Sequence, residues 1–199
     1  MKRLELFIPL QKPYFITQYF GENKIPIYKE LGMLGHNGWD IVLPLGKPIY
    51  AAHDGVVVYA GQDGNEGIGV VVRTTEQYLD INNNPQLFKT IYWHLLPNIP
   101  VKMGQKVNIG DLIGYGDTTG FATGPHLHWG LKPVFQGENE WTWVNVEQNN
   151  GYYGAIDPMP YIQQMTAYEV RTILYQTIPE ILKRVAEGIA NLIKRIGKL

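Results

Sequence analysis

Five side chains in the sequence are of types that bind metal ions or move protons. They are His36 and Asp40 in GHNGWD, His94 in YWHL, and His126 and His128 in GPHLHWG. The chain contains no cysteine, so disulfides and thiolate metal sites are excluded. Any metal ion would therefore be held by imidazole nitrogen and carboxylate oxygen.

The His-x-His pair has the spacing of one face of a β-strand. Side chains alternate between the two faces of a strand, so His126 and His128 would leave one face while Leu127 and Trp129 leave the other. One face would then carry polar chemistry and the other would belong to the core. Taken alone, the pair is a weak indication of a metal site, because histidine is often an ordinary core or surface residue.

His36 and Asp40 would also share a face in an extended segment, with Gly38 between them. A helix would align them too, but Gly35 and Gly38 argue against a helix there. A different interpretation is a capped turn in which Asp40 accepts backbone N–H groups. With His94 at the end of a predicted strand, four of the five histidines lie at strand ends or beside glycines, which favours a cluster.

Short strands joined by tight turns are expected to position these side chains. The composition is 45% hydrophobic with 22 glycines and 13 prolines, which is typical of a globular, mostly β protein. Strands are expected within residues 15–20, 48–61, 67–74, 87–95, 101–116 and 118–133, with turn clusters between them. We expect an antiparallel meander with no helix between Phe15 and Pro133.

The C-terminal segment has a helical pattern. Thr166–Glu169 and Thr177–Glu180 both fit capping boxes, and apolar residues then recur at three- and four-residue spacing. The apolar residues are Ile181, Leu182, Val185, Ile189, Leu192, Ile193 and Ile196, and the basic residues of the other side are Lys183, Arg184, Lys194, Arg195 and Lys198. The sequence thus predicts an N-terminal extension over residues 1–9, a domain over 10–162 and an amphipathic, basic helical tail over 163–199.

Two roles are open for the tail. Its apolar stripe is expected either to pack on the β-domain or a second copy of the chain, or to lie on a membrane surface of anionic lipid. No segment approaches the ~20 apolar residues of a membrane span, and the N-terminal segment has no secretory signal pattern. No nucleic-acid partner is predicted for this chain, whose net charge is -1.

The order of the motifs resembles a known family. GHNGWD, PLGKPIYAAHDGVVVYAG, YWHL and VKMGQKVNIGDLIGYGDTTGFATGPHLHWG follow one another as in the LytM/lysostaphin-type zinc metallopeptidases, which cut peptidoglycan cross-bridges. The resemblance runs from about Phe15 to Pro160. It implies a mostly antiparallel β-sheet or sandwich domain with a groove over a zinc site.

The resemblance also implies roles for the five side chains. His36, Asp40 and His128 would hold a catalytic Zn²⁺ and leave one position open for a water, whose pKa falls from ~15.7 towards about 7. His94 and His126 would act beside that water as general base and as stabiliser of the oxyanion. Which of the two takes which role is left open by the sequence.

The implied function is hydrolysis of a peptide bond in a peptidoglycan stem peptide or cross-bridge at the bacterial cell envelope. The missing signal pattern fits delivery by a phage particle or release by lysis, and it fits a shortened sequence equally well. The alternative is a non-catalytic envelope-binding or regulatory module of the same fold, with a membrane- or partner-binding tail. Aromatic bulk makes Trp39, Tyr92, Trp141 and Trp143 candidates for the groove walls.

Overall fold

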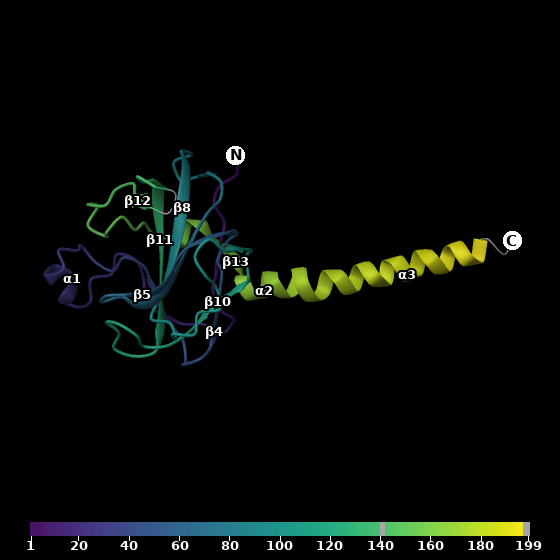
Figure 1. Ribbon diagram of the computed structural model, residues 1–199, viewed down its shortest axis with the longest axis horizontal. Helices are drawn as coiled ribbons and strands as arrows, with labels where there is room; N and C mark the ends of the chain where they lie inside the picture. The colour runs from purple at the N-terminus through teal and green to yellow at the C-terminus, as the bar shows by residue number, and fades with distance from the viewer. Residues whose placement is uncertain (140–141, 197–199) are drawn as a thin grey trace.

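The computed structural model describes residues 1–139 and 142–196 and has a β-domain followed by a long helix (Figure 1). Its main sheet contains β2 (Ile16–Gln18), β3 (Trp39–Val42), β5 (Gly55–Asp63), β6 (Gly67–Arg73), β7 (Tyr78–Leu79), β8 (Pro85–Trp93), β9 (Lys106–Val107), β11 (His126–Gln136) and β12 (Trp143–Asn145). Shorter pairs join β1 (Leu6–Ile8) to β13 (Ile162–Thr166) and β4 (Pro48–Tyr50) to β10 (Leu112–Tyr115). The helical segments are α1 (Ile27–Glu30), a 3-10 turn (Met159–Tyr161), α2 (Ala167–Thr172), a π-helical turn (Ile173–Thr177) and α3 (Ile178–Ile196).

The strand order of the main sheet is β2-β3-β11-β8-β6-β5-β9, with β12 beside β11 and β7 beside β8. All of these neighbours are antiparallel. The predicted fold class, mostly antiparallel β with a C-terminal helix, is confirmed.

Strand β11 separates a core face from an open face of this sheet. Leu127, Trp129 and Leu131 are fully buried in the main core, as the alternation along the strand predicts. The face that carries His126 and His128 has a smaller apolar cluster, which consists of Val58, Val71, Ile91 and Trp93. The sheet is therefore apolar on both faces, but only one face carries the histidine pair.

The first residues of the chain belong to the core of the β-domain. Leu4, Leu6 and Ile8 are buried in the main core, and β1 pairs in parallel with β13 near the other end of the domain. The extension predicted over residues 1–9 is therefore built into the fold. Because β13 pairs with β1, the folded domain continues past residue 162, which the sequence predicts as its last residue.

A single helical turn interrupts the predicted all-β region. The expectation of no helix between Phe15 and Pro133 was wrong at α1, which follows Pro26. The φ of Pro26 is -61°, the value that the proline ring imposes and that a first helical turn requires. Four residues are too few to produce a periodic apolar pattern, so the hydrophobic pattern of the sequence did not reveal the turn.

One of the two predicted capping boxes forms. Thr166 and Glu169 exchange the expected hydrogen bonds at the start of α2. Thr177 caps nothing, because the helix runs through it and its hydroxyl donates to the carbonyl of Thr172. Pro179 has no N–H for the preceding turn, and the backbone widens into the π-helical turn just before this proline.

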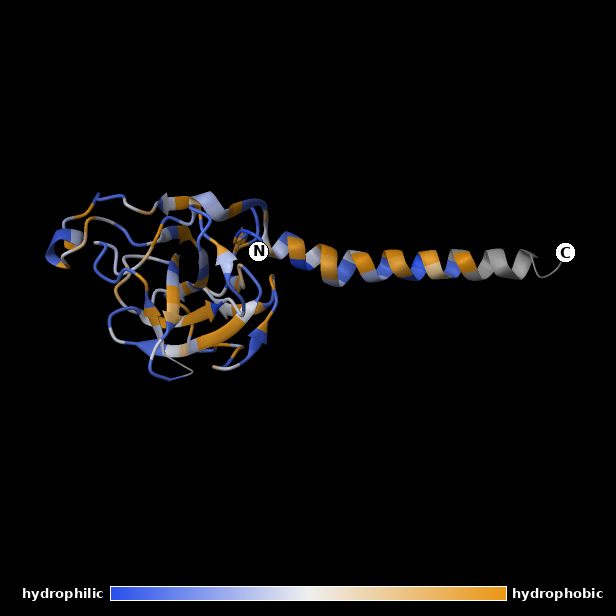
Figure 2. Cartoon of the chain, turned by 90° about the horizontal axis from the view of Figure 1, so that it is seen from above, coloured by the Kyte–Doolittle hydropathy of each residue, from blue (hydrophilic) through white to orange (hydrophobic). Residues whose placement is uncertain are grey.

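Helix α3 projects away from the β-domain and carries its apolar stripe into solvent (Figures 1 and 2). Leu182 and Ile181 are 63% and 53% exposed, and Val185 and Ile189 are exposed to a similar extent. The interpretation that this stripe packs on the β-domain was wrong for these residues. Lys198 and the side chains of residues 188 and 190–196 lie outside the described part of the chain. Among the described residues, none of the helices combines the length and apolar character needed to cross a membrane.

The buried position of β1 predicts a large stability effect. Replacing Leu6 with alanine should lower the free energy of unfolding by about 2–5 kcal/mol, because the side chain is fully buried and its loss leaves a cavity. Leu45→Ala is the matched control, since Leu45 is 60% exposed. Both would be measured by denaturant unfolding. Equal midpoints for the two variants would contradict the placement of β1 in the core.

Candidate metal centre and active site

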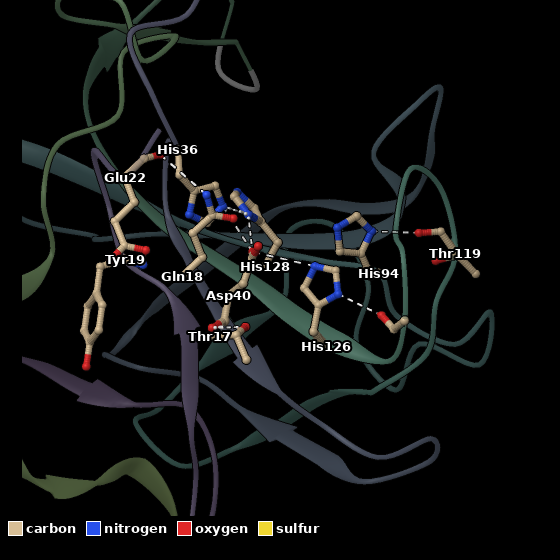
Figure 3. A network of polar contacts seen from close by, with 11 residues as sticks. Thr17, Gln18, Tyr19, Glu22, His36, Asp40, His94, Thr119, His126 and His128 are labelled. Atoms are coloured by element: carbon tan, nitrogen blue, oxygen red, sulfur yellow. Dashed lines mark hydrogen bonds and ion pairs between the residues drawn. The ribbon is translucent and has the colours of Figure 1, made fainter. Parts of the chain in front are cut away.

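Three of the five predicted side chains converge on one point. Nε2 of His36 lies 3.1 Å from Oδ1 of Asp40, and Nδ1 of His128 lies 3.0 Å from the same oxygen. The two imidazole nitrogens are 3.0 Å apart. Figure 3 shows these side chains meeting, with His126 and His94 beside them.

The sheet register brings Asp40 and His128 together. Their Cα atoms are direct partners in the antiparallel pairing of β3 with β11. His36 comes from the segment before β3, and this segment is held by backbone hydrogen bonds from His36 to Glu22 and from Gly21 to His36. Gly38 gives the segment room, because a Cβ there would lie 2.9 Å from Cε1 of His128.

The surroundings of Asp40 keep it ionised. Burial opposes ionisation, but hydrogen bonds to His128 and His36 outweigh burial and hold the pKa of the Asp40 carboxyl well below its usual range. The cluster therefore has one anionic oxygen and two ring nitrogens facing each other across about 3 Å.

This donor set fits a divalent metal ion such as zinc. Ligands held ~2.0–2.2 Å from a tetrahedral zinc lie about 3.3 Å from one another, which is close to the separations of the three atoms here. Imidazole and carboxylate are suitable ligands for zinc, and three protein ligands leave a fourth position for water. His36, Asp40 and His128 are the residues that would hold the ion.

The rings of His94 and His126 are fixed with one nitrogen free. Nδ1 of His94 donates to the carbonyl of Thr119 at 2.7 Å, and Nδ1 of His126 donates to the carbonyl of Gly124 at 2.8 Å. A carbonyl only accepts hydrogen bonds, so in its neutral form each ring carries its proton on Nδ1 and presents the Nε2 lone pair. The ring centroids are 4.6 Å apart, and Nε2 of His126 lies 3.6 Å from Oδ1 of Asp40.

An unusual backbone conformation aims His94 at Thr119. The φ of His94 is +67°, which non-glycine residues seldom adopt and which is found mainly where function requires it. Thr119 is held in turn by Gly67 and Gly120, whose φ values are +79° and +75° and whose backbones are in close contact. Burial lowers the pKa of His94 to about 4, so its ring is neutral at pH 7.

Residues 34–146 contain all five of these side chains and match the profile of Peptidase family M23. The match covers more than half of the chain. The chain belongs to this family. M23 is a family of metallopeptidases, which agrees with the His/Asp/His cluster described above.

Relatives and solved structures support the assignment to M23. Peptidoglycan DD-endopeptidase ShyA of Vibrio cholerae is 36% identical over 124 residues, which make up 62% of this chain but only 26% of ShyA. A zinc-containing peptidase from Vibrio cholerae superposes with a TM-score of 0.57 and 28% identity, over 79% of this chain and 40% of that one. The lysostaphin catalytic domain from Staphylococcus simulans superposes with a TM-score of 0.54 and 24% sequence identity, over 74% of this chain and 91% of that domain. This likeness is one of fold alone. The predicted resemblance to LytM/lysostaphin-type peptidases is confirmed.

A pocket of about 310 Å³ in this M23 domain includes His128 of the metal cluster in its lining. It is lined by Asn37, Val58, Tyr59, Asp63, Glu66, Val71, Lys89, Ile91, Trp93, His128, Lys132, Trp143 and Tyr153. Of the aromatic residues predicted for the groove walls, Trp143 lines the pocket. Trp39 and Tyr92 are buried in the core, because each directly neighbours an open-face residue in its strand and therefore points to the opposite face. Trp141 lies outside the described residues.

Sequence reasoning missed the groups that orient the site. The carbonyls of Thr119 and Gly124 fix the two free histidines, but a backbone acceptor in a loop has no residue-type signature. Lys132 could have been found, because the period of two that places His128 on the open face also places Lys132 there. His53 was given no role, and it is buried with hydrogen bonds to Asp54 and Thr90.

The cluster predicts which histidine is needed for metal binding. Wild-type protein incubated with Zn²⁺ and desalted should carry about one ion per chain, and His128→Ala should carry almost none, because it lacks one of three ligands. His126→Ala is the control and should keep its ion, since its Nε2 points at the cluster from outside. Elemental analysis measures both. Full metal content in His128→Ala would refute the ligand set.

Proposed function

We propose that the protein is a zinc-dependent endopeptidase that hydrolyses a peptide bond in the stem peptides or cross-bridges of peptidoglycan, at the bacterial cell envelope. The observation that carries this proposal is the His36, Asp40 and His128 cluster, with Nε2 of His126 3.6 Å from Asp40 and the ring of His94 6.2 Å from that of His128. The name of ShyA supplies the substrate, because that relative is a peptidoglycan endopeptidase.

The chemistry follows from the lone pairs that the site presents. When bound, zinc would lower the pKa of a water towards about 7 and polarise the scissile carbonyl. The free Nε2 of His94 or His126 can take a proton from the attacking water and pass it to the departing amine. A ring that has gained this proton becomes a donor and can hydrogen-bond negative charge that develops on the carbonyl oxygen. The two rings therefore suit the two proposed roles in either order.

The rival proposal, a non-catalytic envelope-binding module, makes a different prediction for a digest. Purified peptidoglycan from several bacteria would be incubated with metal-loaded protein and the new peptide termini identified by mass spectrometry. Endopeptidase activity should release fragments with new amino and carboxyl ends at one kind of bond. Binding to the sacculi without any new termini would support the rival.

The two free histidines should be needed for cleavage but not for the metal. His94→Ala and His126→Ala should each lower kcat by about 10²–10⁴-fold, as expected when a proton-transfer or oxyanion partner is removed. Their zinc content and unfolding midpoints should stay close to those of wild type. A variant that digests peptidoglycan at the wild-type rate would remove its histidine from the mechanism.

The exposed stripe of α3 supports a second function, attachment. Its apolar side chains are exposed over several turns in the described part of the helix, and Lys183 and Arg184 lie among the polar residues between them. Burying such a stripe is favourable at ~25 cal/mol per Å². We infer that it is covered by a second copy of the chain or by anionic lipid.

Truncation after Thr177 tests the attachment function. This end point keeps Ala167, which is buried, and Tyr168, whose ring lies 5.4 Å from that of Tyr50. The truncated protein should keep its unfolding midpoint and its turnover of soluble peptides. If the full-length protein forms a dimer in analytical ultracentrifugation or co-sediments with anionic liposomes in a salt-sensitive way, the truncated protein should lose that behaviour. A full-length protein that is monomeric and does not sediment with liposomes would refute the attachment function.

A further inference from the structure

Three basic residues form a row across the open face of the sheet. Arg73 on β6 is the direct partner of Lys89 on β8, and Lys89 is the direct partner of Lys132 on β11. Residues paired in this way point to the same face. Lys89 alternates with Ile91 and Trp93, which line the pocket, so the row lies on the pocket side of the sheet.

The two lysines of the row line the same pocket as His128 of the metal cluster. His128 and Lys132 are both on β11 and both line the pocket, with Gly130 between them on that face. Four residues of a strand span about 13 Å, at 3.3 Å per residue. A peptide with its scissile bond at the metal cluster would therefore pass over the row within about four residues.

The ammonium groups of the row have no carboxylate partner. Lys89 donates to the carbonyl of Trp143 at 3.3 Å, and Lys132 donates to the carbonyl of Tyr153 at 2.9 Å. Among residues 1–139 and 142–196, no Asp or Glu oxygen lies within 4.0 Å of either ammonium. Burial lowers the pKa of Lys132, and the charge of Glu66, which lines the same pocket, opposes this effect only in part and without an ion pair among these residues.

Arg73 is held in place beside the lysines. Its guanidinium stacks on the ring of Trp143 at 3.9 Å from the centroid and donates to the carbonyl of Thr74. Its Nε is buried and has no hydrogen-bond partner in the part of the chain that the structure describes. The row thus has a fixed end on β6, whereas the two lysines point into the pocket.

Such a row is costly without an anion. Like charges directly opposite one another on neighbouring strands destabilise a sheet, and burial of ammonium groups adds a desolvation cost. Both effects act on Lys89, where burial and then the charge of Lys132 lower the pKa to about 8. Burial also lowers the pKa of Lys132. A carboxylate between the two would relieve the repulsion and satisfy the unused N–H donors.

We propose that Lys89 and Lys132 bind a free carboxylate of the peptide substrate, so that the enzyme selects acidic peptides. The inference rests on the proposed function and narrows it. A glycine cross-bridge has no side-chain charge, whereas stem peptides carry free carboxylates on glutamate and diaminopimelate residues unless these are amidated. The row therefore favours unamidated stem peptides over glycine bridges.

Matched synthetic peptides test this selection. Two cross-linked stem peptides would be compared, identical except that the glutamate and diaminopimelate carboxylates are free in one and amidated in the other. Wild type should cleave the free acid with a kcat/KM higher by on the order of 10- to 100-fold, as expected for charge-assisted hydrogen bonds. The difference should lie mainly in KM, because the row is remote from the scissile bond.

Lys89→Met and Lys132→Met should each bring the ratio of kcat/KM for the free-acid peptide to kcat/KM for the amidated peptide closer to one. Methionine keeps most of the length and the apolar contacts of lysine, and zinc content and unfolding midpoint report whether each variant is folded. Lys106→Met is the matched control, since Lys106 is an exposed lysine on β9 at the far edge of the same sheet, and it should keep the wild-type preference. Equal kcat/KM for free and amidated peptides in wild type, or an unchanged preference in both lysine variants, would overturn the proposal.

Binding measurements separate failure of this inference from failure of the proposed function. If wild type cleaves neither peptide, the proposed function fails, and titration calorimetry of the zinc-loaded protein still compares the two peptides. Tighter binding of the free acid, lost in Lys132→Met, would support the carboxylate site on its own. Equal affinity for the two peptides would refute the site.

Discussion

The pairing of β3 with β11 is the constraint on which the site depends. It sets Asp40 directly opposite His128, so a carboxylate oxygen and a ring nitrogen lie 3.0 Å apart without any flexible connection between them. A register slip of one residue would turn His128 into the core and Trp129 out into the groove. The buried position of Trp129 therefore fixes the register, and the packing of the core determines the geometry of the metal cluster.

Loops supply the groups that the sheet cannot. His36 precedes β3, and the carbonyl of Thr119 that orients His94 belongs to the segment before β11. Both segments are held by close backbone contacts, at Gly21 and Gly35 for the first and at Gly67 and Gly120 for the second. Such contacts allow a loop to carry a site with the precision of a strand, because the backbones touch with no side chain between them.

The sequence predicted what depends on local geometry. A strand period of two placed His128 on the open face and Trp129 in the core, and the order of motifs indicated the family. The same period would have placed Tyr92 in the core, but its aromatic bulk was taken as a sign of a groove wall, and bulk does not specify a face. The pairing of Leu6 with Ile162 joins the two ends of the domain, and no local pattern encodes such a contact.

The charges along the groove are complementary to one class of peptide at both ends. A divalent ion with one carboxylate and two neutral imidazoles would leave the cluster with a net positive charge, and the lysine row about 13 Å away is positive too. A peptide with a free carboxylate would be attracted both by the metal cluster and by the lysine row. An uncharged glycine segment would be attracted only through its carbonyl groups. Asp63 and Glu66 line the same pocket, so a carboxylate is favoured only where Lys89 and Lys132 lie closer to it than these two acidic residues.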